Sequence, residues 1–361
     1  RRREILGRLA TGELSLVVGT HAVIEEPVVF ADLAVAVVDE QHRFGVRQRR
    51  ALDSKGVDGM APHVLHMTAT PIPRTLALAR YGDLDTTTLR ELPQGRRPVD
   101  TRLLSGESER ASAYERLRAE LSAGRQAFVV CPLIDEAEPL AASDPAAAPA
   151  AGVAGAAGGD AARVGLRAAT AELARLREGE LEGFELALLH GGMRPREKQE
   201  AMAAFASGSA DVLVATTVIE VGIDVPNATV MLVENAERFG ISQLHQLRGR
   251  VGRGEHRSSC FLVGPPTPRL RALAEHSDGF RLAEIDLELR SEGELTGTRQ
   301  SGFGQFRVAC LPEDTPLLEL ARERAQAIFA VDPELRSPEY ALLAMALERM
   351  LGEQALEPIP A

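Results

Sequence analysis

The sequence predicts an α/β protein with two parallel-sheet domains followed by a helical region. Short β-branched apolar runs alternate with helical patterns, which is typical of parallel sheets with helices on both faces. Turn-forming residues interrupt this pattern at residues 93–98, and strand-like runs stop after Pro265 and Pro266. A length of 361 residues fits two to three domains of about 150 residues each. We therefore expect domains at 1–97 and 98–265 and a helical region at 266–361.

Eight apolar runs are expected to form strands. They lie at Leu14–Val18, Leu33–Val38, Val64–Met67, Ala127–Cys131, Leu186–Leu189, Val212–Ala215, Val230–Val233 and Cys260–Val263. Residues 196–207 are expected to form a helix, because Met202 and Phe205 share a face and Gly208 follows as a stop signal.

Two further segments differ in composition from these elements. Residues 141–162 are almost all Ala, Gly and Pro, which predicts a flexible inserted loop without chemistry. Near the end of the chain, apolar residues recur at helical spacing and are expected to be core. They are Leu317, Leu318, Ala321, Ala325, Ile328 and Phe329, and, after Ser337 and Pro338, Leu343, Leu347 and Met350.

Composition excludes several classes of protein. No apolar run approaches the ~20 residues that a membrane span needs. The three cysteines are far apart, which disfavours a disulfide framework or a Cys-x-x-Cys metal site. No signal-peptide pattern follows the first arginines, so we expect a cytoplasmic protein. The formal net charge of −11 disfavours coating of nucleic acid through overall charge but leaves room for a local basic groove.

Two short segments carry the candidate chemistry. Asp39, Glu40, Gln41 and His42 directly follow an apolar strand, where an acidic residue can hold Mg²⁺ and an adjacent carboxylate can polarise water. Taken alone, such a pair of acids is more often an ordinary surface pair than a catalytic one. Between Gln246 and Arg253, glycines separate closely spaced arginines. This spacing suits two guanidinium groups that reach a γ-phosphate, the alternative being a basic helix end paired with acidic neighbours.

The order of these segments resembles the motifs of superfamily 2 helicases. The matching segments are Gly19-Thr20-His21-Ala22 (motif Ib), Asp39-Glu40-Gln41-His42 (motif II), Thr68-Ala69-Thr70 (motif III), residues 216–226 (motif V) and residues 246–253 (motif VI). The resemblance implies a pair of RecA-like domains that close on ATP, the first of them truncated at its N-terminus.

The resemblance extends to the RecG family of ATP-dependent DNA helicases. It is carried by the stretches DEQHRFGVRQR, MTATPIPRTL, VIEVGIDVPNATVMLVENAERFG and SQLHQLRGRVGRG, and by Gly297-Thr-Arg-Gln-Ser-Gly302, which is similar to the family's TRG element. In that family, a helical hairpin and the following loop convert domain closure into movement along duplex DNA. The resemblance therefore implies a monomeric motor that uses ATP and Mg²⁺ on branched duplex DNA, at stalled forks and Holliday junctions. A single-stranded DNA-binding protein is a further partner that it leaves open.

Carried over position by position, the resemblance implies a role for each motif residue. Asp39 would hold Mg²⁺, Glu40 would orient the hydrolytic water, and Gln41 and His42 would relay the nucleotide state. Thr68 and Thr70 would link that state to DNA, as would Thr20, His21, Arg299 and Gln300. Gly222 and Asp224 would approach the nucleotide, Asp224 toward its ribose, while Arg250 and Arg253 contact the phosphates and Gln246 helps to set them. For His21 and His190, a DNA contact and a local turn bond are equally compatible with the sequence.

The sequence departs from the family in several ways, two of which bear on activity. It contains no Gly-x-x-x-x-Gly-Lys-Ser/Thr segment, the loop that cradles phosphates, and no wedge domain. We therefore expect the chain alone to hydrolyse ATP poorly or not at all. Two alternatives remain open from the residues: the motor of a transcription-repair coupling factor, and a DNA-binding remnant without catalysis.

Overall fold

The computed structural model describes residues 2–40, 51–52, 55–56, 60–69, 86–89, 91, 97–132, 169–216, 224–296 and 314–351. Contacts divide the chain into two compact units, residues 88–293 and residues 1–87 together with 294–361. The division into three parts that the sequence predicts stays a prediction, and the two units are described separately below.

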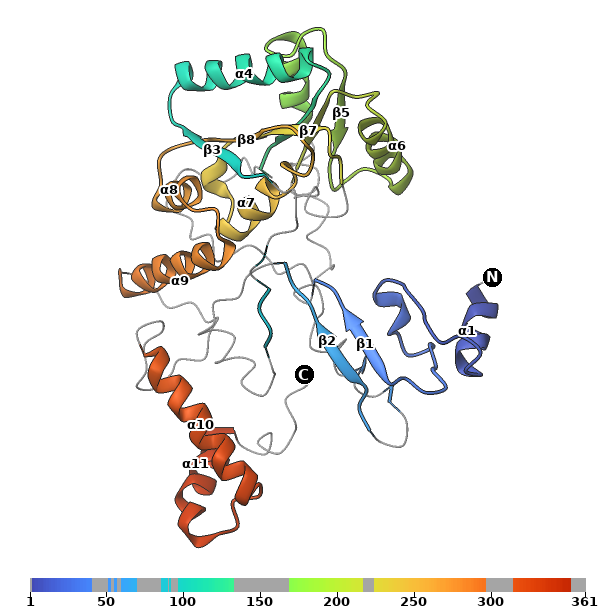
Figure 1. Ribbon diagram of the computed structural model, residues 1–361, viewed down its shortest axis with the longest axis vertical. Coiled ribbons are helices and arrows are strands. Elements are labelled where there is room, and N and C mark those ends of the chain that lie inside the picture. Colours follow the sequence, from blue (N-terminus) through green and yellow to red (C-terminus); the bar gives the residue numbers. More distant parts are fainter. Residues whose placement is uncertain are drawn as a thin grey trace. The chain divides into compact units, whose positions relative to one another are not determined.

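The larger unit is built on a six-stranded parallel sheet (Figure 1). Its strand order is β3-β8-β7-β4-β6-β5, and every neighbouring pair is parallel. The strands are β3 (Val99–Leu104), β4 (Gln126–Val130), β5 (Leu186–Leu189), β6 (Val212–Ala215), β7 (Ala228–Val233) and β8 (Ser258–Val263). Residues of β4, β6 and β7 are buried throughout, because helices cover both faces of a parallel sheet and leave its inner strands without a polar side.

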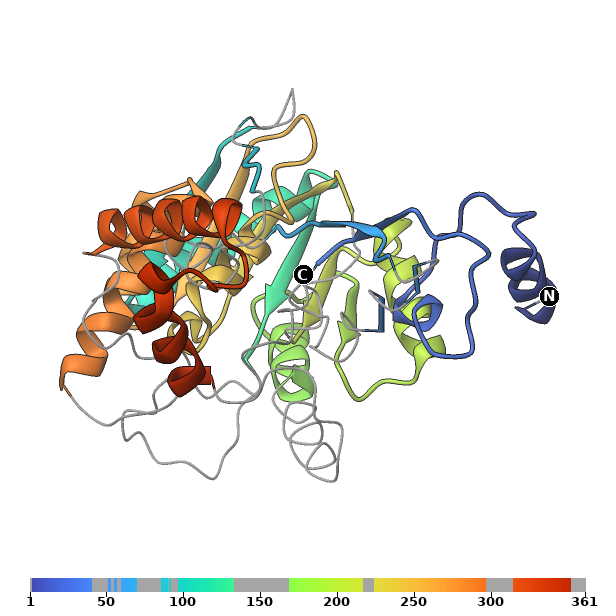
Figure 2. The same ribbon diagram turned by 90° about the horizontal axis from the view of Figure 1, so that it is seen from below.

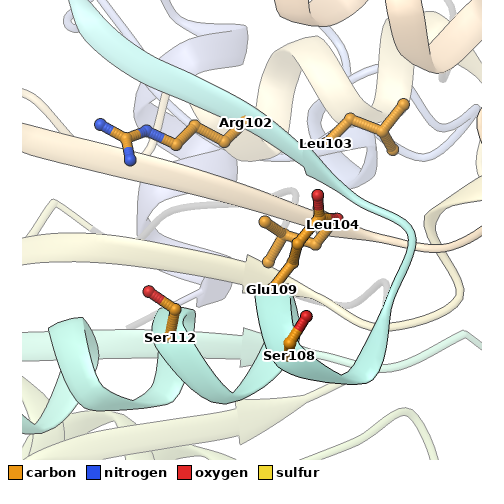
Figure 3. A pocket seen from close by; sticks show the side chains of 6 residues that line it. All are labelled: Arg102, Leu103, Leu104, Ser108, Glu109 and Ser112. Atoms are coloured by element: carbon orange, nitrogen blue, oxygen red, sulfur yellow. The ribbon is translucent and has the colours of Figure 1, made fainter.

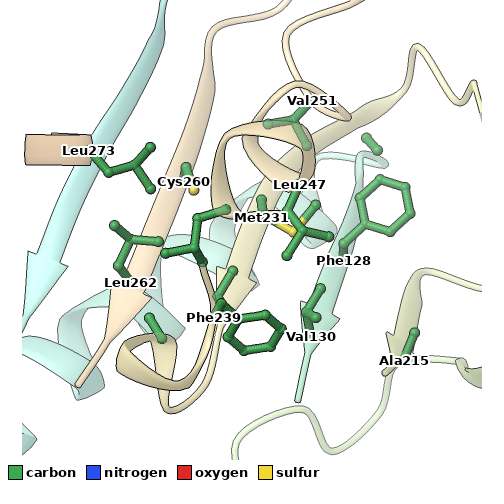
Figure 4. Packing of buried hydrophobic residues seen from close by; sticks show 14 of the residues in the cluster. Phe128, Val130, Ala215, Met231, Phe239, Leu247, Val251, Cys260, Leu262 and Leu273 are labelled. Carbon is green, nitrogen blue, oxygen red and sulfur yellow. The ribbon is translucent and has the colours of Figure 1, made fainter. Parts of the chain in front are cut away.

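Helices cover this sheet on both faces. α4 (Glu107–Ser122) and the helical residues 169–178 cover one face, whereas α6 (Pro195–Ala206), α7 (Ile241–Arg248) and α8 (Pro268–Glu275) pack on the other. α9 (Gly279–Thr296) follows, and its first half also packs on that second face, through Leu282, Ile285 and Leu289. Figure 4 shows how Leu247 and Val251 lie among strand residues such as Met231 and Phe128 in this core.

The smaller unit contains two parallel strands and several helices. Its elements are α1 (Arg2–Ala10), the short helix η1 (His21–Val23), β1 (Val35–Val38), β2 (His63–His66), α10 (Thr315–Val331), η6 (Pro338–Tyr340) and α11 (Ala341–Leu351). α10 and α11 follow one another near the C-terminus and are drawn in red in Figures 1 and 2. Behind β1 and β2 lies a small core of Ile24, Val38 and Leu52.

The structure corrects three sequence-based expectations. Residues 14–18 form no strand: Leu16 and Val18 are 80% and 89% exposed, and no described segment pairs with them. Conversely, the sequence did not predict β3, because its charged residues Asp100 and Arg102 break the apolar run of an edge strand that is covered on only part of its surface. The third correction concerns α10 and α11, described next.

The apolar stripes expected to be core are not buried in α10 or α11. In the described residues of these helices none is buried, and Leu317 and Phe329 are 50% and 69% exposed. Helical periodicity identifies a face that can be buried, but it does not supply a surface to cover that face. The remaining strands and the helix expected at 196–207 are found within a few residues of their expected bounds. The insert at 141–162 lies outside the described residues.

Candidate functional site

The acidic pair of the smaller unit lies where two parallel strands end together. Val38 pairs with His66, and the Val38 carbonyl accepts a hydrogen bond from the Met67 amide at 2.8 Å. Asp39 and Glu40 therefore follow β1 at the same sheet edge at which Thr68 follows β2. The structure brings these motif II and motif III residues together, although they are separated in sequence.

A left-handed turn shapes this pair. Glu40 has a φ of 52°, which is uncommon for a residue with a side chain, and its amide donates to Asp39 Oδ1 at 2.9 Å. Glu40 is half-buried, whereas Asp39 is exposed. The two adjacent carboxylates thus have different surroundings, as a metal contact and a water-orienting group would need. Gln41, His42 and Thr70 lie outside the described residues.

The motif Ib residues lie at the start of η1. Thr20 precedes this short helix and its carbonyl accepts from the Val23 amide at 3.0 Å, while its side chain makes no capping bond. Both Thr20 and His21 are exposed. Their exposure leaves them available to a ligand, and their role in contacting DNA stays a prediction.

In the larger unit, two motif segments meet. Arg253 Nη1 lies 3.3 Å from Asp224 Oδ1, and Arg253 Nε donates to the Gly249 carbonyl at 3.1 Å. A Cβ built at Gly254 would lie 2.3 Å from the carbonyl oxygen of Pro226, so the backbones of the two segments also touch. Only glycine permits this approach, which explains in physical terms the glycine that directly follows motif VI.

The other candidates of motif VI lie along α7 and its end. Gln246 is half-buried within α7, and Arg250 is half-buried just after it. The Arg250 amide donates to the Leu247 carbonyl at 2.9 Å, which tightens the helix end. Gly222, Arg299 and Gln300 lie outside the described residues, so the structure does not test their placement.

Arg248 has a structural role that the sequence did not reveal. Its side chain is buried and donates to the carbonyls of Leu273 and His276, both at 2.8 Å, and of Ser277 at 3.2 Å. It therefore ties the end of α7 to α8 and to the segment that follows α8. In the sequence, Arg248 looked like one more member of an arginine cluster, and only its burial distinguishes it.

A second buried polar network lies at the ends of β4 and β7. Glu234 accepts hydrogen bonds from Arg110 Nη2 and Tyr114 Oη, both at 2.8 Å. Arg175 Nη2 donates to Tyr114 Oη at 3.1 Å and to Glu172. Burial, together with the Glu234 carboxylate, raises the pKa of Tyr114, and the hydrogen bond to Glu172 raises the pKa of Arg175. Tyr114 therefore stays neutral and Arg175 stays charged at neutral pH. The hydrogen bonds of this network join segments that are distant in the sequence.

His190 makes the local turn bond, the second of the two interpretations that the sequence allowed. Its Nδ1 accepts from the Gly192 amide at 3.1 Å. Burial, with a smaller effect of the Lys198 cation, lowers the pKa of His190. The ring is therefore neutral at physiological pH, which suits the acceptor role of Nδ1.

A surface hollow lies between α4 and β3, apart from these motif residues. Figure 3 shows its lining by Arg102, Leu103, Leu104, Ser108, Glu109 and Ser112. Its charges are largely satisfied locally: Arg102 pairs with Asp100 at 2.8 Å, and Glu109 accepts from the Ser105 amide at 2.8 Å. We therefore assign it no part in the candidate site.

Comparisons with known proteins agree with this arrangement. A profile of the helicase conserved C-terminal domain matches residues 164–255, and one described as ATP-dependent DNA helicase RecG, domain 3, C-terminal, matches residues 276–355. The RecG of Synechocystis sp. is 46% identical over 363 residues, covering 99% of this chain and 40% of that protein. The RecG of Mycobacterium tuberculosis is 47% identical over 359 residues, covering 96% of this chain and 45% of that protein.

A solved structure agrees as well. It is described as RecG bound to a three-way DNA junction, has a TM-score of 0.62 and 40% identity, and the match covers 88% of this chain and 38% of that one. The parallel sheets and the motifs at their edges define a RecA-like protein of the superfamily 2 helicase class. Within this class the chain is a homologue of the RecG helicases along nearly its whole length. It spans less than half the length of these curated relatives.

Proposed function

We propose that this chain is part of an ATP-dependent DNA helicase that moves along double-stranded DNA. The observation that carries the proposal is the meeting of motifs V and VI, where Arg253 is held against Asp224 on a fold homologous to RecG. An arginine that reaches a transferring phosphoryl group accelerates hydrolysis by roughly 10³–10⁵. Hydrolysis would drive branch migration at stalled forks and Holliday junctions.

The residues present fit a nucleotide that brings its own magnesium ion. Among the described residues, no cluster of three or more His, Cys, Asp or Glu side chains could hold a metal. Magnesium needs only one or two protein carboxylates when phosphate oxygens and waters complete its shell. The exposed carboxylate of Asp39, at the end of β1, meets that need. The ion would offset the phosphate charge, while Glu40 would orient the attacking water.

Further features of the proposal concern partners and location. The solved relative is described as bound to a three-way DNA junction, which supports branched duplex DNA as the substrate. We extend the proposal to a monomeric motor that works in the cytoplasm, with a single-stranded DNA-binding protein as a further partner. None of the helices in the described part of the chain is both long and apolar enough to cross a membrane. The two curated relatives described above are RecG helicases, so the coupling-factor alternative is not favoured.

Replacement of Glu40 tests the proposal. In a full-length helicase that contains these residues, Glu40→Gln should lower DNA-stimulated ATP hydrolysis by about 10²-fold or more, because the amide cannot polarise water. DNA affinity should be unchanged, as measured by fluorescence anisotropy with a forked duplex. Glu26→Gln, at an exposed acid of the same unit, is the matched control. Near-normal turnover of Glu40→Gln would contradict the role given to Glu40.

A further inference from the structure

The backbone on the C-terminal side of Asp224 is held in place by burial and hydrogen bonds. Val225 is 4% exposed and belongs to the main core of the larger unit. Asn227 Nδ2 donates to the Gly124 carbonyl at 3.0 Å and to Gln126 Oε1 at 3.2 Å. Although the Asp224 carboxylate is itself exposed, its point of attachment is therefore defined by burial and hydrogen bonding on its C-terminal side.

The backbone that carries Arg253 is fixed in a similar way. Val251 is fully buried in the same core. Gly252 has a φ of +78°, and a Cβ there would lie 2.9 Å from a Val99 methyl carbon. Gly254 touches the carbonyl of Pro226 as described above. Arg253 thus lies between two glycines whose positions are set by close backbone approach.

The guanidinium group of Arg253 is held on two of its three nitrogens. Nε donates to the Gly249 carbonyl, and Nη1 pairs with Asp224 Oδ1. Within the described residues, Nη2 makes no hydrogen bond or ion pair. Because the guanidinium is planar and rigid, two fixed nitrogens determine the direction in which the third one points.

We propose that Asp224 is a positioning residue that orients Arg253 toward the phosphate of the nucleotide, rather than a ligand of the ribose. This inference rests on the proposed ATPase function. An exposed ion pair contributes little to the stability of a fold. The effect of the Asp224 carboxylate is therefore expected in turnover and not in folding.

Asp224→Asn in the full-length helicase is the first test. Loss of the carboxylate charge leaves the Arg253 guanidinium bonded to the Gly249 carbonyl but less precisely oriented. We therefore expect kcat to fall about 10- to 100-fold while KM for ATP stays nearly constant. Asp224→Glu retains the carboxylate and should restore part of the loss. Glu255→Gln is the matched control, because Glu255 is exposed on the same loop and has no ion pair among the described residues.

Two further measurements separate this role from ribose binding. In an Arg253→Ala background, Asp224→Asn should cause no additional loss, since the group that it positions is gone. With 3′-deoxy-ATP in place of ATP, the loss caused by Asp224→Asn should be unchanged. Additive losses, or a loss that disappears with 3′-deoxy-ATP, would overturn the inference while leaving the ATPase function intact.

The outcomes also separate this inference from the function on which it rests. A wild-type protein without ATP hydrolysis would overturn both. Wild-type hydrolysis with Asp224→Asn equally active would overturn the positioning role alone. Thermal unfolding of each variant monitors folding. If Asp224→Asn does not fold, the double variant Asp224→Glu with Arg253→Lys tests the coupling between these two residues instead.

Discussion

His190 shows how one residue can look functional in the sequence and be explained by its local structure. It follows β5 directly, at an edge where ligands of parallel sheets are often bound. In the structure its Nδ1 accepts a hydrogen bond from the Gly192 amide in the following turn. That bond requires a neutral ring, so the chemistry of His190 is tied to the stability of the turn.

This bond predicts a dependence of stability on pH. The pKa of His190 is lowered in the folded chain, mainly by burial, whereas an unfolded histidine has a pKa of about 6.5. As the pH falls below that value, the unfolded state takes up a proton that the folded state resists, so the free energy of unfolding should decrease. The melting temperature of the wild type should therefore fall more steeply between about pH 6.5 and 5 than that of His190→Gln. Parallel curves would contradict this explanation.

Buried polar residues were the least predictable from sequence. Tyr114 and Glu234 bond to one another although they are separated by 120 positions. No local pattern connects such residues, because only the fold places them together. The cysteines are a simpler case: burial raises the pKa of Cys260 to about 12 and also raises that of Cys131, so both are inert core thiols.

At the scale of elements, strands were predicted best where they are buried on both sides. β6 has the bounds expected from its apolar run, since an inner strand of a parallel sheet must be apolar throughout. β3 was not predicted from the sequence. Conversely, residues 14–18 were predicted to form a strand and do not. A strand requires a neighbour, and hydrophobicity alone does not provide one.

The hydrogen bonds of the buried Arg248 side chain give a prediction at this scale. Arg248→Met preserves much of the side-chain volume but leaves the buried carbonyls of Leu273 and His276 without their donor. The free energy of unfolding should fall by about 2–4 kcal/mol, as measured by urea denaturation of the chain. Arg257→Met is the control, because Arg257 is a nearby arginine with an exposed side chain. A decrease in the free energy of unfolding below about 0.5 kcal/mol would show that these hydrogen bonds contribute little to stability.

At the scale of the whole molecule, the smaller unit exposes apolar surface on one side of its two strands. Val35, Val37 and Leu65 are 60%, 59% and 54% exposed, and register places them on the same face. Val38, on the opposite face, is buried in the small core. Contiguous apolar surface of this kind favours self-association.

We therefore expect the 361-residue chain to associate as its concentration rises. The double variant Val37→Thr with Leu65→Thr should reduce that association, since threonine retains β-propensity but is less apolar. Sedimentation velocity over a range of concentrations measures the effect. Val38→Thr serves for comparison, because it should lower the stability of the small core without reducing association. Unchanged association of the double variant would show that another surface mediates the association.

The sequence by itself determined the class of fold, most of the strands and the motif residues on which the proposed function rests. These properties are local, because apolar runs, turn formers and short motifs each consist of residues that are close together in the sequence. Only the tertiary structure decided that Asp224 meets Arg253, that Arg248 is a buried clamp, and that the apolar faces of α10 and α11 are exposed. These properties depend on which distant segments come into contact, and the free energy of those contacts belongs to the fold and not to any single segment.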